Sequence, residues 1–171
     1  GFRLAADYQD FSKALGSSDQ YRKFYGEAAA ALGSSWARIA LVGRAGSDLK
    51  SDIPAYDNYQ VGGFESLSGY RQEELSGDNF LAGRLALLFK LPVPKTLIWK
   101  RVYFLGLADS GLVMNRWKDW SWEHSKKGGS AGVGFETPLG PLFLAYGLAG
   151  YNHQQFYISL GRSWLSRETT R

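Results

Sequence analysis

Apolar and polar side chains alternate residue by residue along most of this chain. Phe2, Leu4, Ala6 and Tyr8 are separated by more polar neighbours, and the same alternation recurs at 23–32, 37–44, 81–91, 102–108, 131–136, 142–146 and 155–164. A period of two is typical of a β-strand with one apolar face. About eight strands of about ten residues each match the length of tilted strands that cross a membrane. The pattern therefore predicts an all-β fold.

One segment also fits a helix. The stretch "GEAAAALG" at Gly26–Gly33 contains four consecutive alanines, which favour a helix intrinsically. Glycine brackets the run, however, and Tyr21, Lys23 and Tyr25 alternate just before it. We therefore interpret this segment as a strand.

Short and long connections alternate between the predicted strands. The short ones are 33–35, 92–95 and 138–140, and the long ones are 11–20, 46–77 and 110–128, with a shorter link at 147–154. Outer-membrane barrels pair brief periplasmic turns with extended outer loops in this way. The pattern predicts an antiparallel transmembrane β-barrel, with Tyr8, Trp36, Tyr146 and Trp164 as an interfacial aromatic girdle. A soluble, lipocalin-like barrel with its apolar face inward remains the alternative.

Composition excludes several other classes. The 171 residues suit one domain, 1–171, with the long loop at 46–77. The net charge of +4 is scattered without a basic run, so we expect no nucleic-acid partner. Cysteine is absent, which removes disulfides and thiolate chemistry.

We expect no catalytic, metal or cofactor site. Glu123, His124 and Ser125 are adjacent, so alternate faces keep them from forming a relay, and the two histidines lack ligand spacing. "NRWKDWSW" at Asn115–Trp122 could grip a partner or lipopolysaccharide, but its tryptophans fit a membrane interface better.

Five short motifs follow one another along the second half of the chain and its long loop. "GGF" at Gly62–Phe64 and "LSGY" at Leu67–Tyr70 lie in the long loop, "LADSG" at Leu107–Gly111 follows, and "GVGFETPLGPLFLAYG" at Gly132–Gly147 comes near the end, before "FYISLGRSW" at 156–164. Together these motifs resemble the outer membrane protein 85 superfamily, which includes barrel-assembly insertases and two-partner secretion transporters. The form of the loop is similar to the branch in which the barrel follows a patatin-like lipase. No Gly-x-Ser-x-Gly motif is present, so the resemblance assigns no lipase activity to this chain.

The resemblance implies a lumenal loop motif and wall residues that receive it. The motif corresponds to Gly63, Phe64, Leu67, Ser68, Gly69, Tyr70 and Arg71, the wall acids to Asp109 and Glu136, and the turn motif to Thr137, Pro138, Gly140 and Pro141. The family's loop arginine, which pairs with a wall acid, is Ser68 here. Arg71 is a candidate substitute.

A loop as long as 46–77 does not fit inside an eight-stranded barrel, whose lumen is filled by its own side chains. The resemblance maps this chain to the C-terminal half of a larger barrel. We therefore expect either missing N-terminal strands or a homodimer that closes one barrel, because strand edges are not left open in lipid.

The expected location is the bacterial outer membrane, in contact with lipid and lipopolysaccharide. The resemblance implies translocation or insertion of polypeptide without a cofactor. The alternatives are a passive membrane anchor for a lipase passenger and a small-ligand-binding barrel.

Overall fold

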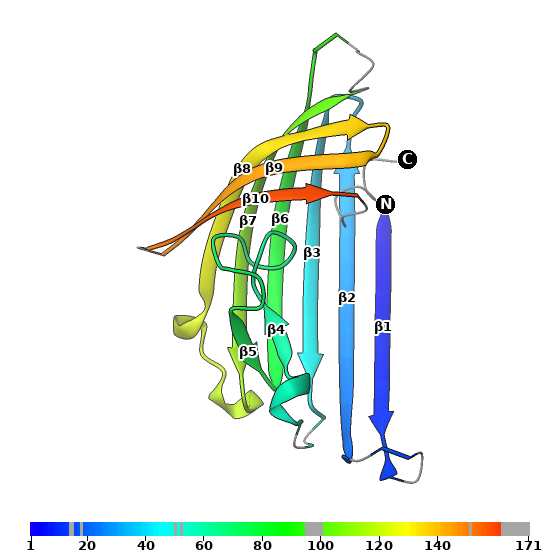
Figure 1. Ribbon diagram of the computed structural model, residues 1–171, viewed down its shortest axis with the longest axis vertical. Coiled ribbons are helices and arrows are strands. Elements are labelled where there is room, and N and C mark those ends of the chain that lie inside the picture. The colour runs from blue at the N-terminus through cyan, green and yellow to red at the C-terminus, as the bar shows by residue number, and fades with distance from the viewer. Residues whose placement is uncertain are drawn as a thin grey trace.

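The computed structural model contains one large antiparallel sheet with a long loop packed on one face (Figure 1). It describes residues 1–13, 16–17, 19–49, 51, 53–94, 101–150 and 152–161. The strands follow one another in space in the order of the sequence. They are β1 (Phe2–Phe11), β2 (Tyr21–Gly33), β3 (Ala37–Ser47), β6 (Asn79–Leu91), β7 (Val102–Met114), β8 (Lys126–Thr137), β9 (Gly140–Ala149) and β10 (His153–Leu160).

The strand prediction is confirmed, including the alanine-rich segment. Gly26–Gly33 lies inside β2, where Ala28, Ala29 and Ala30 pair with β1 on one side and β3 on the other. Two hydrogen-bonded neighbours override the helical preference of alanine. Residues 162–164 of the predicted last strand, Trp164 among them, and residue 95 of the predicted 92–95 turn lie outside the described residues.

The loop between β3 and β6 has structure of its own, which the alternation did not predict. A short 3-10 helix, η2 (Ala55–Asp57), leads into a two-stranded ribbon of β4 (Tyr59–Val61) and β5 (Leu75–Gly77). The loop between β7 and β8 likewise contains η3 (Trp117–Asp119) and η4 (Trp122–His124). No helix in the described ranges is long and apolar enough to cross a membrane.

The two faces of the sheet differ in their side chains. We call the face that carries Phe2, Leu4, Leu41, Ile158 and their row the outer face, because these apolar side chains are 58% to 71% exposed. The opposite, inner face holds the loop and the buried residues. Exposed apolar side chains therefore lie on the face away from the loop. An exposed apolar outer face is what a membrane barrel requires, whereas a soluble ligand-binding barrel has polar groups there.

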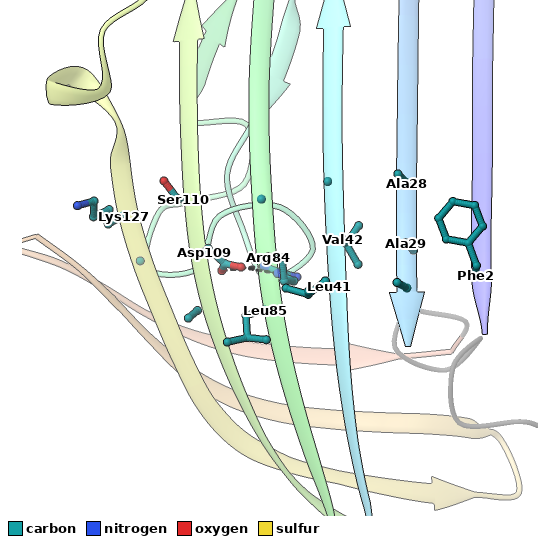
Figure 2. A pocket seen from close by; sticks show the side chains of 15 residues that line it. Phe2, Ala28, Ala29, Leu41, Val42, Arg84, Leu85, Asp109, Ser110 and Lys127 are labelled. Atoms are coloured by element: carbon teal, nitrogen blue, oxygen red, sulfur yellow. Dashed lines mark hydrogen bonds and ion pairs between the residues drawn. The ribbon is translucent and has the colours of Figure 1, made fainter. Parts of the chain in front are cut away.

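Glycines on β3 and β6 leave a shallow hollow of about 710 Å³ in the outer face (Figure 2). A Cβ atom built on Gly43 or Gly83 would meet nothing within 4 Å. The hollow is bordered by Phe2, Leu41 and Leu85. It lies on the opposite side of the sheet from the loop.

Within the described residues, the sheet is not closed into a barrel. β1 pairs with β2 and β10 pairs with β9, so each edge strand has one neighbour. Figure 1 shows β8, β9 and β10 curving away from the straighter strands β1, β2 and β3, and the loop contacts both β3 and β10. The loop therefore packs on the concave side of the sheet.

The direction of the two faces leads to a first test. Leu4→Arg places a charge on the outer face of β1, and we expect it to lower the free energy of unfolding in lipid vesicles by about 2–4 kcal/mol if the position lies near the bilayer midplane. Ala5→Arg, one residue along on the inner face, is the matched control and should cost less than about 1 kcal/mol. Equal losses at both positions would contradict the assignment of the faces.

Candidate functional site

The tip of the long loop packs directly on the backbone of the inner wall. Leu67 and Ser68 are 0% exposed. A Cβ atom added to Gly128 on β8 would lie 1.9 Å from the Ser68 carbonyl oxygen, and one added to Gly69 would lie 2.4 Å from the Ala149 nitrogen. Gly69 also has a φ of +91°, which a side chain rarely adopts. Glycine is therefore required on both sides of this contact.

A buried ion pair in the wall lies beneath the loop tip. Arg84 on β6 and Asp109 on β7 are directly opposite in the register of the two strands. The Arg84 Nε donates to Asp109 Oδ1 at 2.5 Å, and Nη2 donates to Oδ2 at 2.8 Å. Figure 2 shows the two side chains pointing toward one another. Their side chains are only 3% and 0% exposed, so the pair is a two-bond fork shielded from water.

The loop tip completes the hydrogen bonds of this pair. The Ser68 backbone N–H donates to Asp109 Oδ2 at 2.8 Å, so the carboxylate accepts three hydrogen bonds. Arg84 Nη1 donates to the Phe64 carbonyl at 2.7 Å, and its Nη2 lies 3.4 Å from Ser68 Oγ. Ser68 Oγ is also 3.1 Å from Ser130 Oγ on β8. A buried ion pair needs such additional bonds to offset its desolvation, so pair and loop stabilise each other.

The edge strand β10 also contacts the tip. The Tyr157 hydroxyl accepts from the Gly69 N–H at 2.9 Å and donates to the Tyr70 carbonyl at 2.8 Å. The Tyr70 ring lies 4.6 Å from the His153 ring, and His153 Nδ1 is 3.3 Å from Glu74 Oε1. Burial raises the pKa of the Tyr70 phenol, and the nearby Glu74 carboxylate raises it further.

The structure brings together most of the loop residues that the sequence singled out. Gly63 closes the turn by accepting the Leu67 N–H at 3.0 Å, and Phe64 and Tyr70 are 6% exposed in the two cores of the inner face. Asp109 lies under this loop.

Two predicted residues lie elsewhere. The Arg71 side chain is exposed, and its backbone N–H donates to Glu74. Glu136 lies at the turn end of β8, where it accepts from the Tyr103 hydroxyl at 2.9 Å and pairs with Arg101 at 3.4 Å. Neither contact involves the loop tip. The cation beside Asp109 is Arg84, on the wall.

The turn motif forms a tight β8–β9 connection. Thr137 and Gly140 are paired across the turn, with the Thr137 hydroxyl donating to the Gly140 carbonyl at 2.6 Å, and Gly140 has a φ of +117°. Pro138 lies in the turn, and Pro141 pairs with Glu136. The motif shapes the end of the sheet opposite the long loops.

Sequence reasoning missed Arg84, Ser130 and Tyr157. Arg84 falls at a polar position of the alternating segment 81–91, but its partner depends on the strand register, which the alternation of one strand does not contain. In the loop between β7 and β8, Glu123 and His124 are exposed residues of η4, and the half-buried Ser125 follows them. No group of three metal-binding side chains occurs among the residues that the structure describes.

The fold and this site together define an eight-stranded antiparallel wall of the outer-membrane barrel type, with a long loop packed on its inner face. The family pattern described as the Omp85 superfamily domain matches residues 1–164. The chain therefore belongs to the Omp85 superfamily, a family of insertases and translocators located in the bacterial outer membrane.

A solved structure has the same fold. The crystal structure of BamA from Haemophilus ducreyi lacking POTRA domains 1–3 superposes with a TM-score of 0.72 at 16% sequence identity. The match covers 92% of this chain and 37% of that one, so this chain spans well under half of its length. The comparison with curated proteins found no match.

The buried pair gives a second test. Asp109→Ala leaves the Arg84 charge buried without its partner, so we expect the free energy of unfolding to fall by about 3–5 kcal/mol. Loss of heat-modifiability on a gel and a denaturant titration in vesicles would measure this change. The double variant Arg84→Met with Asp109→Leu removes both charges and should recover part of the loss.

Arg71→Ala is the control for that test, because Arg71 is an exposed cation of the same loop. We expect it to change stability by less than about 0.5 kcal/mol. If Arg71→Ala were as damaging as Asp109→Ala, the cation that matters would be on the loop rather than on the wall.

Proposed function

We propose that this chain forms half of the wall of an outer-membrane barrel that translocates or inserts polypeptide, with the loop braced against Arg84 and Asp109 to hold one conformation of the lumen. The observation that carries the proposal is the position of the loop tip. If the loop, residues 48–78, only covered the mouth of the pore, the Ser68 backbone amide would not need to donate to the buried Asp109 carboxylate of the wall. The loop is instead held deep against the inner face by charge-assisted hydrogen bonds.

The loop position supports a gating role. Its tip is connected to β6 and β7 through the ion pair, to β8 through Ser130 and to β10 through Tyr157. A single segment that bonds to four strands restrains their relative positions. Displacement of the tip would therefore change both the free cross-section of the lumen and the freedom of the edge strand β10.

We further propose that β1 and β10 each pair with an additional strand. Both edge strands expose apolar outer side chains along their length, such as Leu4 and Ile158, so both edges lie in lipid. Unpaired backbone groups there cost several kcal/mol each. The two edges of an eight-stranded antiparallel sheet run in opposite directions. Closure therefore takes an even number of further strands, supplied by the same polypeptide or by a second copy.

The size of the detergent-solubilised particle tests closure. For this chain of 19.0 kDa alone, we expect a protein mass of two copies, measured by light scattering with correction for bound detergent. A monomer whose β1 and β10 amides are all protected from hydrogen exchange would contradict the proposal, because the chain would then close on itself.

Gating is tested separately by conductance in planar bilayers. Asp109→Ala should release the loop tip and raise the frequency of open events, whereas Arg71→Ala should leave the currents unchanged. In a longer polypeptide that carries a patatin-like passenger, removal of residues 48–78 should alter export. Export that is unaffected would favour the passive anchor.

A further inference from the structure

A second arginine of the wall contacts the loop, two strands away from Asp109. Arg44 on β3 donates from Nη1 to the Glu65 carbonyl at 2.5 Å and from Nε to Glu27 Oε2 at 2.8 Å. One planar guanidinium therefore bridges a loop carbonyl and a wall carboxylate at the same time. Arginine holds two acceptors in a fixed geometry in this way, which lysine does not.

The Glu27 carboxylate is the centre of this second group. Glu27 on β2 lies directly opposite Arg44 in the strand register. It also pairs with Arg3 on β1 and accepts from the Tyr25 hydroxyl at 3.3 Å. The Glu27 and Arg44 side chains are 11% and 15% exposed, compared with 0% and 3% for Asp109 and Arg84. The second group is therefore more open to the lumen than the first.

The two arginines hold consecutive peptide groups. Arg84 donates to the carbonyl of Phe64, and Arg44 donates to the carbonyl of the next residue, Glu65. They come from the neighbouring strands β6 and β3, and each is oriented by a carboxylate on the strand beyond, β7 for Asp109 and β2 for Glu27. The loop is thus held by two neighbouring strands near the middle of the sheet.

We infer that Arg44, oriented by Glu27, is a positioning residue that fixes the loop against β1, β2 and β3. The inference rests on the proposed role of the loop. With the Arg84 contact alone, the segment around Glu65 would pivot about the tip. With both contacts, the distance between the segment around Glu65 and the edge strand β1 is fixed. Arg44 acts through the backbone of the loop, so the identity of the Glu65 side chain, which is exposed, is not critical.

The test uses one reporter cysteine in a chain that has none of its own. Ser66→Cys places a thiol at a half-buried position next to Glu65, and its rate of alkylation in detergent micelles measures release of the loop. Arg44→Lys keeps a cation beside Glu27 but removes the fork. We expect alkylation to accelerate about tenfold, as the loss of one charge-assisted hydrogen bond implies. Glu27→Gln should also accelerate alkylation at Ser66→Cys.

Two controls separate positioning from general destabilisation. Arg38→Lys makes the same substitution on the same face of β3 and should leave the rate unchanged. A cysteine at Ala40, which is 4% exposed on β3, reports opening of the sheet itself. An unchanged rate at Ser66→Cys in Arg44→Lys would overturn the inference. Equal acceleration at Ala40→Cys would overturn it as well, because the role would then be structural.

The outcome does not depend on transport. If Arg44→Lys releases the loop while Asp109→Ala leaves bilayer currents at the wild-type level, the positioning role stands and the proposed gating function fails. If bilayer currents respond to Asp109→Ala but the alkylation rate at Ser66→Cys is the same with and without Arg44→Lys, the proposed function stands and this inference fails.

Discussion

The buried ion pair between Arg84 and Asp109 is the contact on which the arrangement of the inner face depends. Two charges removed from water are stable only when their remaining hydrogen-bonding groups are satisfied. The loop supplies those partners through the Ser68 amide and the Phe64 carbonyl. In return, the pair gives the loop a fixed position on the wall. The wall charge and the loop conformation are therefore one structural unit.

The cation of this unit lies at a different place from the one that the resemblance implies. The resemblance puts a loop arginine where this chain has Ser68. The guanidinium is found instead on β6, still paired with Asp109 and still bonded to the loop. The small Ser68 side chain lies beside this pair, and its hydroxyl is within hydrogen-bonding distance of the Ser130 hydroxyl. Only the direction of the contact is reversed, because the cation now reaches from the wall to the loop.

Much of the fold could be predicted from alternation and from the lengths of the connections. The alanines of β2 show the limit of local propensity, since pairing with two neighbours decided their conformation. The ribbon of β4 and β5 was not predicted, because three-residue strands carry too little periodicity. Within the site, Asp109 was identified through its motif, whereas Arg84, Arg44 and Glu27 were not.

The sequence by itself determined which residues share a face and which face is apolar, because the period of two is a property of one strand. It could not determine which residues meet across strands, since register is set by pairing over the whole sheet. Arg84 opposite Asp109, Arg44 opposite Glu27 and Tyr157 above Gly69 are consequences of that register and of the sheet curving over the loop. Tertiary structure alone decided these contacts, because their members are distant in the chain and are joined only when the wall is assembled.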